Sequence, residues 1–184
     1  MKKLLLITGD LATGKSTFAT ILSRRYGTIV IYKDKIKEVL GDTIGFSDRK
    51  ENLKLSKATM ELMIHAFSEI AKLSPNVILE ANFKADELLR LHKIAGEHDY
   101  DILTLSLEAD INILYTRFVN RIENENRHPV HISGFDGFES FKGYIESSRK
   151  HTAIGNVIKI SADDFSYQSD EFILSQIDKF IGVI

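Results

Sequence analysis

Apolar residues follow two alternating patterns along almost the whole chain. Continuous apolar runs rich in β-branched and aromatic residues predict strands that are covered on both faces, at residues 4–8, 28–32, 77–79, 101–107 and 156–161. Between these runs, apolar positions at helical spacing predict helices at about residues 15–26, 34–40, 49–73, 85–96, 110–121 and 170–181. Strands and helices therefore alternate in sequence.

Such alternation is typical of a parallel sheet, because two parallel neighbouring strands need a crossover connection, which is usually a helix. We expect a three-layer α/β/α fold with a five-stranded parallel sheet, built by a single domain over residues 1–184. Sheets of this kind bind ligands beyond the carboxyl ends of their strands. The residues that directly follow each strand are therefore the candidates for function.

One stretch interrupts this regular pattern. Residues 124–137 read NENRHPVHISGFDG, which is polar, contains Pro129 and two glycines, and shows no helical or strand period. Loops of this kind cover the active sites of many enzymes. The pattern predicts a mobile lid over about residues 122–137.

The composition excludes several classes of function. The 184 residues include 24 Lys and Arg against 26 Asp and Glu, which gives a formal net charge of −2. This near balance argues against a protein that coats DNA or binds an anionic membrane. Because the chain has no cysteine, a disulfide scaffold, a thiol nucleophile and a Cys-based zinc site are excluded.

The apolar run near the N-terminus resembles the core of a signal peptide but is too short. It covers residues 4–7, and a glycine and an acid follow it. No other stretch approaches the roughly 18 apolar residues that a membrane span needs. We therefore expect a soluble, cytoplasmic protein.

The loop after the first predicted strand fits the phosphate-binding pattern G-x-x-x-x-G-K-[ST]. Its residues, with the threonine that follows, are Gly9, Asp10, Leu11, Ala12, Thr13, Gly14, Lys15, Ser16 and Thr17. Glycines let the backbone N–H groups turn toward phosphate oxygens, and the start of the next helix adds further N–H groups and its positive dipole end. Lys15 is expected to reach the β- and γ-phosphates of ATP, and the Ser16 hydroxyl to ligate Mg²⁺.

Two residues of this loop depart from its commonest form. Thr13 occupies a position where a smaller residue often stands, and Asp10 places an acid in a loop that binds anions. The Asp10 side chain either points away from the phosphates or touches the acceptor substrate, and the sequence does not distinguish these alternatives.

The chain resembles the small P-loop kinases, a group that includes polynucleotide kinase, gluconate and shikimate kinases, chloramphenicol phosphotransferase and zeta toxin. The resemblance covers nearly the whole chain and rests on GDLATGKST, on Tyr32-Lys33-Asp34, on VILEANF at residues 77–83, and on RFVNRIENENRHP at residues 117–129. It implies an ATP- and Mg²⁺-dependent kinase that phosphorylates a hydroxyl of a small-molecule acceptor. The N-K-x-D pattern of guanine-specific switches is absent.

Asp34 follows the second predicted strand and is a candidate catalytic residue. Phosphoryl transfer needs in-line positioning and an acceptor for the proton of the attacking hydroxyl, and an aspartate within hydrogen-bond reach can serve. The resemblance assigns this role to Asp34. The alternative is a structural N-cap of a helix that begins at Lys35, and one residue can fill both roles.

Glu80 ends the third strand, where a carboxylate would hold Mg²⁺ through water. Most sites of this kind use Asp, so the longer Glu side chain leaves a second interpretation open, in which Glu80 faces the acceptor together with Asn82 and Phe83. A third interpretation is a solvated acid at the end of a strand.

Three arginines are predicted to hold the nucleotide. Arg117 and Arg121 lie four residues apart on one face of the helix before the lid, and Arg127 lies inside the lid. In adenylate-kinase-like enzymes the first arginine of such a pair stacks on adenine and the second reaches the phosphates, while a lid arginine stabilises the transferring group. The alternative is that all three are ordinary solvated arginines.

The acceptor-binding region is expected in the helices at about residues 34–73, and no motif identifies the acceptor or the oligomeric state. His128 and His131 are interpreted as polar lid residues and not as metal ligands, because no partner pair stands at a ligand-like spacing. Two other functions stay open. One is a nucleotide-binding regulator or slow ATPase without an acceptor, and the other is a kinase of 5′-hydroxyl nucleic acid ends, which the net charge does not favour. A role on a nucleotide sugar rests on fold-level analogy alone.

Overall fold

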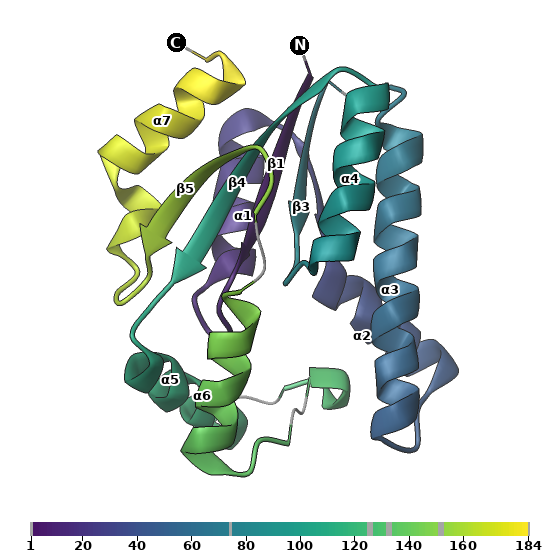
Figure 1. Ribbon diagram of the computed structural model, residues 1–184, viewed down its shortest axis with the longest axis vertical. Helices are drawn as coiled ribbons and strands as arrows, with labels where there is room; N and C mark the ends of the chain where they lie inside the picture. Colours follow the sequence, from purple (N-terminus) through teal and green to yellow (C-terminus); the bar gives the residue numbers. More distant parts are fainter. Residues whose placement is uncertain (1, 74, 125–126, 132–133, 151–152, 184) are drawn as a thin grey trace.

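A parallel sheet with helices on both faces forms the centre of the molecule (Figure 1). The structure is a computed structural model that describes residues 2–73, 75–124, 127–131, 134–150 and 153–183. The strand order is β2-β3-β1-β4-β5, and every neighbouring pair is parallel. The strands are β1 (Lys2–Gly9), β2 (Ile29–Tyr32), β3 (Asn76–Glu80), β4 (Tyr100–Glu108) and β5 (Asn156–Ser161). The five-stranded parallel sheet predicted from the sequence is confirmed.

The central strand β1 shows why an unbroken apolar run was the signal for this sheet. Leu4, Leu5, Leu6 and Ile7 are each at most 1% exposed, because helices cover both faces of the strand. Successive side chains alternate between the faces, so Leu4 and Leu6 belong to one apolar cluster and Leu5 and Ile7 to the other.

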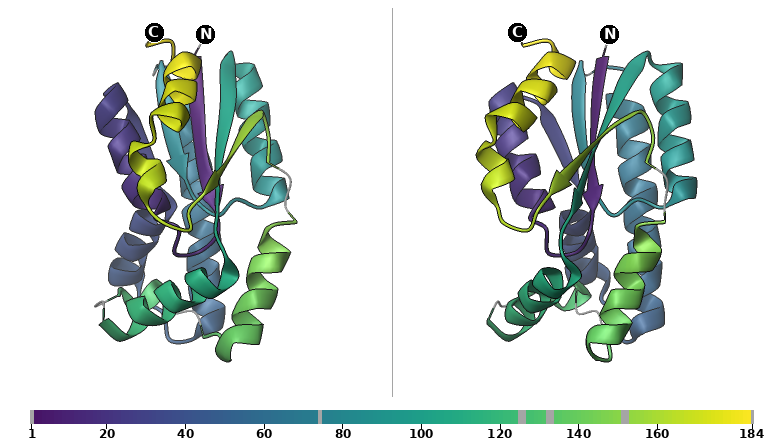
Figure 2. Two further views of the ribbon diagram at one scale, coloured as in Figure 1. Left: turned by 90° about the vertical axis from the view of Figure 1, so that its left-hand side faces the viewer. Right: turned by 60° about the vertical axis from the view of Figure 1, so that its left-hand side comes forward.

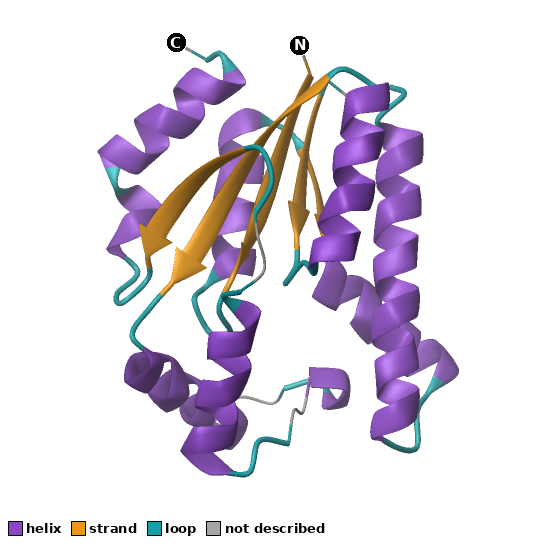
Figure 3. Cartoon of the chain, in the orientation of Figure 1, coloured by secondary structure: helices purple, strands orange, loops and turns teal. Residues whose placement is uncertain are grey.

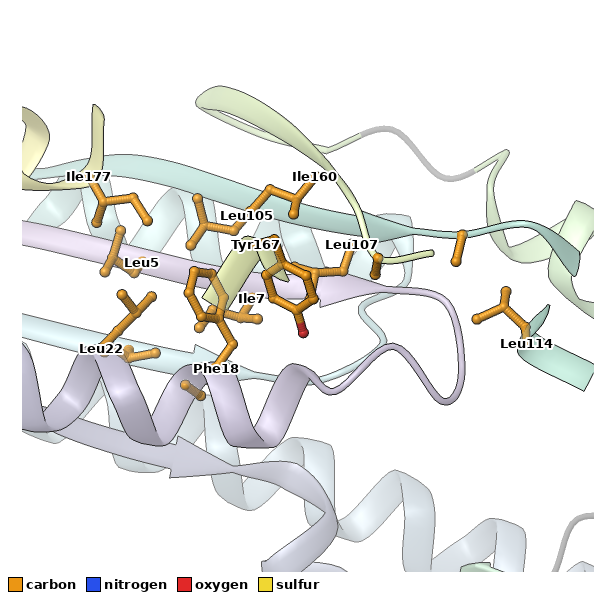
Figure 4. Packing of buried hydrophobic residues seen from close by; sticks show 14 of the residues in the cluster. Leu5, Ile7, Phe18, Leu22, Leu105, Leu107, Leu114, Ile160, Tyr167 and Ile177 are labelled. Carbon is orange, nitrogen blue, oxygen red and sulfur yellow. The ribbon is translucent and has the colours of Figure 1, made fainter. Parts of the chain in front are cut away.

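Two helical layers enclose these clusters (Figure 2). On one face, α1 (Lys15–Tyr26) and α7 (Glu171–Ile181) pack on the sheet, with Phe18 and Tyr167 in an edge-to-face contact at 5.2 Å between ring centroids (Figure 4). On the other face, α3 (Arg49–Ile70) and α4 (Ala85–Glu97) contribute Met63, Phe67 and Leu91. The predicted three-layer arrangement is confirmed.

The remaining helices gather beyond the carboxyl ends of the strands, at the end of the molecule opposite both termini (Figures 1 and 3). They are α2 (Lys33–Ile44), α5 (Ile111–Asn124), the single-turn η1 (Pro129–His131) and α6 (Gly137–Ser148), while a further short turn, η2 (Ser166–Ser169), follows β5. Since β1 runs directly into the phosphate-loop sequence, these helices surround the candidate site.

The helix α6 was not predicted. Its sequence, GFESFKGYIESS, contains two glycines and directly follows an irregular stretch, which weakens the helical signal. The helix forms because Phe141 and Ile145, four residues apart, are fully buried in the same cluster as Phe118 of α5. The lid predicted over residues 122–137 is therefore bounded by two helices. Of its residues, 125–126 and 132–133 lie outside the described part of the chain.

None of the described helices is both long enough and apolar enough to cross a membrane.

Candidate active site

The loop between β1 and α1 contains residues with positive φ angles, which favour glycine. Gly9 and Gly14 have φ angles of 121° and 83°, a region that L-residues with a side chain rarely adopt, and Ala12 lies at 60°. A Cβ atom on Gly9 would overlap the carbonyl oxygen of Leu107 in β4. The two motif glycines are therefore required by the shape of the loop, as the phosphate-binding interpretation demands.

Two hydroxyl groups hold this loop in shape by hydrogen bonds to its carbonyl oxygens, and one of them explains why a threonine stands at position 13. The buried Thr13 hydroxyl donates to the carbonyl oxygen of Asp10 at 2.9 Å, and the Tyr167 hydroxyl donates to the carbonyl oxygen of Thr13 at 2.7 Å. A Cβ atom on Gly14 would lie 2.8 Å from the Tyr167 hydroxyl oxygen. The sequence analysis missed Tyr167, which is more than 150 residues from the loop, because no local motif marks it.

The acid in the loop points away from the phosphate side. The Asp10 side chain is 1% exposed and forms an ion pair with Arg149 at 2.6 Å, at the carboxyl end of α6. It also accepts a hydrogen bond from the backbone N–H of Ala109 at 3.2 Å, and Arg149 donates to the carbonyl oxygen of Ala109 at 2.6 Å. Of the two alternatives for Asp10, the structure shows the first. The acid joins the loop to β4 and α6, and Arg149 is a second residue that the sequence did not reveal.

Lys15 lies at the mouth of the loop. Its ammonium donates to the carbonyl oxygens of Gly9, at 3.2 Å, and of Asp10. Burial lowers the pKa of Lys15, and the carboxylates of Glu80 and Asp34 oppose this shift. A cation that is poorly hydrated and held by neutral carbonyls is well prepared to bind an anion such as a phosphate.

Ser16 and Glu80 form the pair that was predicted for Mg²⁺. The Ser16 hydroxyl donates to Oε2 of Glu80 at 3.0 Å, and Glu80 is 4% exposed at the end of β3. Burial raises the pKa of Glu80, while the charge of Lys15 acts in the opposite direction. A hydroxyl and a carboxylate are oxygen ligands of the kind that Mg²⁺ prefers, and their position beside the loop fits a metal bound to nucleotide phosphates. The interpretation of Glu80 as a solvated acid is wrong.

Asp34 lies in the first turn of α2 and is exposed. The helix begins at Lys33, its N-cap is Tyr32, and no side chain caps it, so the interpretation of Asp34 as an N-cap is wrong. Asp34 is close enough to Lys15 and Glu80 to raise the pKa of each. The carboxylate is thus free of a capping role and lies beside the groups that would hold the γ-phosphate.

Arg117 is held against the loop that follows β5. Its guanidinium donates to the carbonyl oxygens of Ala162 and Asp163, both at 2.7 Å, and lies over the Phe165 ring at 4.3 Å. Phe165 is 48% exposed, and one edge of its ring would be 3.1 Å from a Cβ atom on Gly14. An exposed aromatic ring between an arginine and the phosphate loop is a suitable surface for a purine base. The sequence analysis had not singled out Phe165.

The other two arginines lie near the same end of the sheet. Arg121, one turn after Arg117 in α5, is close enough to Lys15 to lower the pKa of that lysine. Arg127 is half-buried and lies two residues before η1. The structure thus brings Arg121 to the phosphate side.

Residues 127–131, which we call the docking segment, pack against α2. The Val130 carbonyl accepts hydrogen bonds from the Lys37 ammonium at 2.9 Å and from the Asn52 side chain at 3.2 Å. His128 and His131 pair with Asp42 at 2.9 Å and with Glu38 at 2.8 Å. Both acids belong to α2, so the two histidines join the docking segment to this helix. Within the part of the chain that is described, no three His, Asp or Glu residues group as metal ligands would.

Gly41 allows this docking because Val130 occupies the space that a side chain would need. A Cβ atom on Gly41 would overlap Cγ1 of Val130, which is 2% exposed. We expect Gly41→Ala to release the docking segment while the fold stays intact, because Ala is a better helix former than Gly by about 1 kcal/mol. Amide hydrogen exchange at Val130 should accelerate at least about tenfold.

Two further variants make this test specific. Gly41→Ala combined with Val130→Ala removes the overlap and should restore protection. Gly96→Ala in α4, where a Cβ atom meets nothing within 4 Å, should leave exchange at Val130 unchanged. Continued protection of Val130 in the Gly41→Ala single variant would contradict this role of Gly41.

The comparisons with known proteins agree with this geometry. A family model described as an AAA domain matches residues 4–139. The fold is similar to that of a candidate kinase from Chloroflexus aurantiacus, with a TM-score of 0.81 and 23% identity over 97% of each chain.

Two further solved structures share the fold at lower similarity. A sugar kinase from Janibacter matches with a TM-score of 0.63 and 12% identity, covering 100% of this chain and 96% of the other. A tunicamycin resistance protein from Deinococcus radiodurans matches with a TM-score of 0.60 and 16% identity over 96% of each chain. No curated protein matches the sequence. At these identities the structural matches show a shared fold and nothing further.

Proposed function

The chain belongs to the AAA domain family, and we propose that it is a kinase that transfers the γ-phosphate of ATP to a hydroxyl of a small-molecule acceptor. The observation that carries this proposal is the position of Asp34. This exposed carboxylate lies within electrostatic reach of Lys15 and Glu80, at the mouth of a glycine-shaped phosphate loop. A protein that only binds nucleotide has no need of a further carboxylate at this position.

The nucleotide half of the site would use the backbone from Gly9 to Ser16. Apart from the N–H of Asp10, which donates to the carbonyl oxygen of Leu107, the N–H groups of this loop and of the start of α1 would bind the phosphates, and the Lys15 ammonium would move from its two carbonyl partners to the β- and γ-phosphates. Ser16 and Glu80 would hold Mg²⁺, directly or through water. When bound, the metal neutralises charge that develops on the phosphate oxygens.

The acceptor half would use Asp34. The acceptor oxygen forms a bond to the γ-phosphorus while the bond from that phosphorus to the bridging oxygen of ADP breaks. The proton of the acceptor hydroxyl passes to the Asp34 carboxylate, which can take it because Asp34 is exposed and engaged in no cap. Arg121 adds positive charge beside Lys15, and Arg127 is proposed to add more from the docking segment, over the transferring group.

The adenine is proposed to lie by Arg117 and Phe165. Both residues border the phosphate loop from the side of β5, and their planar groups already stack on each other. We propose that the acceptor binds beside the helices α2 and α3, on the opposite side of the loop. These helices form the region 34–73 in which the sequence predicts acceptor binding.

An acceptor screen tests this function. Radiolabelled ATP is incubated with the protein, Mg²⁺ and, in separate reactions, D-glucose, D-gluconate, glycerol, uridine, or an oligonucleotide with a 5′-hydroxyl. The proposal predicts labelled product from a small molecule and little ADP without one. ADP release that no acceptor increases would instead indicate a slow ATPase or regulator, and label on the oligonucleotide alone would indicate a nucleic-acid kinase.

The Asp34→Asn variant tests the role of this carboxylate. We expect kcat for the phosphorylated acceptor to fall by about 10²-fold or more, with the KM for ATP changed less than about twofold, because the amide cannot take the proton. The control is Asp86→Asn, which alters another exposed acid in the first turn of a helix, α4. An unchanged kcat in Asp34→Asn would remove Asp34 from the reaction.

A further inference from the structure

The side-chain oxygen of Asn82 is a buried polar atom for which the described part of the chain supplies no hydrogen-bond donor. Removing such an atom from water is unfavourable unless a donor replaces the lost water, so this oxygen is suited to a hydrogen-bond donor that the described residues do not supply.

The backbone around Asn82 is held by the sheet and by buried neighbours. The missing partner of the Asn82 side-chain oxygen is therefore not the result of a poorly packed loop. Asn82 lies two residues after Glu80, where the chain leaves β3, and its neighbours Ala81 and Phe83 are 4% and 5% exposed. The backbone N–H of Ala81 donates to the carbonyl oxygen of Ile7 in β1 at 3.1 Å. The Asn82 side chain is therefore held at the carboxyl edge of the sheet, next to the strand that leads to the phosphate loop.

The residue that faces Asn82 is Tyr144 of α6. A hydrogen bond from the Asn82 side chain to the Tyr144 hydroxyl opposes the rise that burial causes in the pKa of this phenol. The Tyr144 ring packs on Phe135, with 5.3 Å between centroids. The helix that carries Tyr144 is anchored by the buried Phe141 and Ile145 and, at its end, by the Arg149–Asp10 ion pair.

Asp34 connects this pair to the phosphate loop. Its charge acts on Tyr144 as well as on Lys15 and Glu80, so the Asp34 carboxylate lies within electrostatic reach of both the phosphate loop and Tyr144. An acceptor whose hydroxyl meets Asp34 would thus extend toward Asn82 and Tyr144.

We propose that Asn82 and Tyr144 form the acceptor subsite, and that the acceptor is a polyhydroxy compound, a sugar or a polyol. This inference rests on the proposed kinase function. One acceptor hydroxyl faces Asp34 and is phosphorylated, and a neighbouring hydroxyl donates its hydrogen bond to the unpartnered oxygen of Asn82. Tyr144 closes the other side of the subsite, where its hydroxyl can donate to or accept from the same compound. Asn82 and Tyr144 are binding residues and take no part in proton transfer.

The test uses two pairs of acceptors that differ by one hydroxyl, D-glucose with 2-deoxy-D-glucose and glycerol with 1,3-propanediol. For the wild-type protein we expect kcat/KM for the better polyol to exceed that of its deoxy partner by at least about tenfold. In Asn82→Ala this ratio should fall toward one, because KM for the polyol rises while KM for ATP and for the deoxy compound stays the same. Asn82→Asp keeps an acceptor oxygen and should restore part of the preference, and Tyr144→Phe should also raise KM for the polyol.

The controls distinguish a loss of acceptor binding from a loss of folding. They also distinguish a failure of the proposed subsite from a failure of the proposed kinase function. Asn156→Ala, at the far end of β5, should leave the ratio unchanged. The melting temperature of Asn82→Ala should stay close to that of the wild type, because the removal of an unsatisfied buried oxygen and the loss of the hydrogen bond to Tyr144 act in opposite directions. Transfer by the wild type to uridine but to no polyol, or an unchanged polyol KM in Asn82→Ala, would overturn the inference and leave the kinase function standing. Absence of transfer to any acceptor would overturn both.

Discussion

Replacing Lys15 by Met is expected to lower kcat for phosphoryl transfer by about 10³-fold or more while the protein remains folded. The ammonium is the cation that the phosphate loop offers to the β- and γ-phosphates, and Met fills a similar volume without charge. Burial lowers the pKa of Lys15, so its charged form is less favourable in this position than in water, even beside Glu80 and Asp34. The melting temperature of Lys15→Met should therefore stay close to that of the wild type, because the removal of a buried charge and the loss of its attraction to Glu80 act in opposite directions.

The comparison uses steady-state assays with the best acceptor of the screen and thermal unfolding without nucleotide. The control is Lys93→Met in α4, where the side chain is 79% exposed, and it should leave both quantities unchanged. A second expected difference is that Mg·ATP raises the melting temperature of the wild type and of Lys93→Met but raises that of Lys15→Met much less. Full turnover in Lys15→Met would show that the loop is not the catalytic phosphate site.

Replacing Arg149 by Met is expected to destabilise the protein by about 2 kcal/mol or more, which corresponds to a fall in melting temperature of roughly 4–8 °C. The variant leaves the Asp10 carboxylate, 1% exposed, without its counter-ion. The guanidinium is 31% exposed and can be hydrated when it loses its partner, so Asp10→Asn should cost less than Arg149→Met. The double variant Asp10→Asn with Arg149→Met should recover much of the stability, because the neutral amide still accepts from the Ala109 N–H.

An exposed pair of similar geometry is the matched control. Arg90 donates to both oxygens of Glu61 at 2.6 and 2.7 Å, but these side chains are 45% and 50% exposed. Arg90→Met should cost less than about 1 kcal/mol, because water screens the exposed pair and replaces the lost contacts. Equal effects of Arg149→Met and Arg90→Met, measured by urea unfolding, would contradict the view that Asp10 depends on Arg149.

The sequence predicted those parts of the site that depend on patterns among residues close together in the chain. The order of strands and helices follows from apolar periodicity, and the phosphate loop follows from glycines whose positive φ angles no other residue type tolerates well. Glu80 was placed at the end of β3 because an acid there ends a buried run. Its hydrogen bond with Ser16 follows from the sheet, because β3 lies beside β1, and β1 leads through the loop into the first turn of α1.

The parts that the sequence did not reveal depend on contacts between distant residues. Asp10 and Arg149 are 139 positions apart, and nothing around either of them indicates the other. The helix α6 has weak local propensity and forms because Phe141 and Ile145 are buried against α5. The packing of the docking segment on α2 likewise depends on the contact of Val130 with Gly41. Apolar periodicity in the sequence does not predict such a contact.

The central claim is that the backbone amides of the loop between β1 and α1 bind the phosphates of ATP. The most direct measurement is a titration of ¹⁵N-labelled protein with Mg²⁺ and a non-hydrolysable ATP analogue, followed by amide chemical shifts. We expect the largest changes at the amides of Gly14, Lys15 and Ser16, and much smaller changes there with AMP, which lacks the β- and γ-phosphates. Binding of the analogue with unchanged shifts at these three amides would show that the loop does not hold the phosphates.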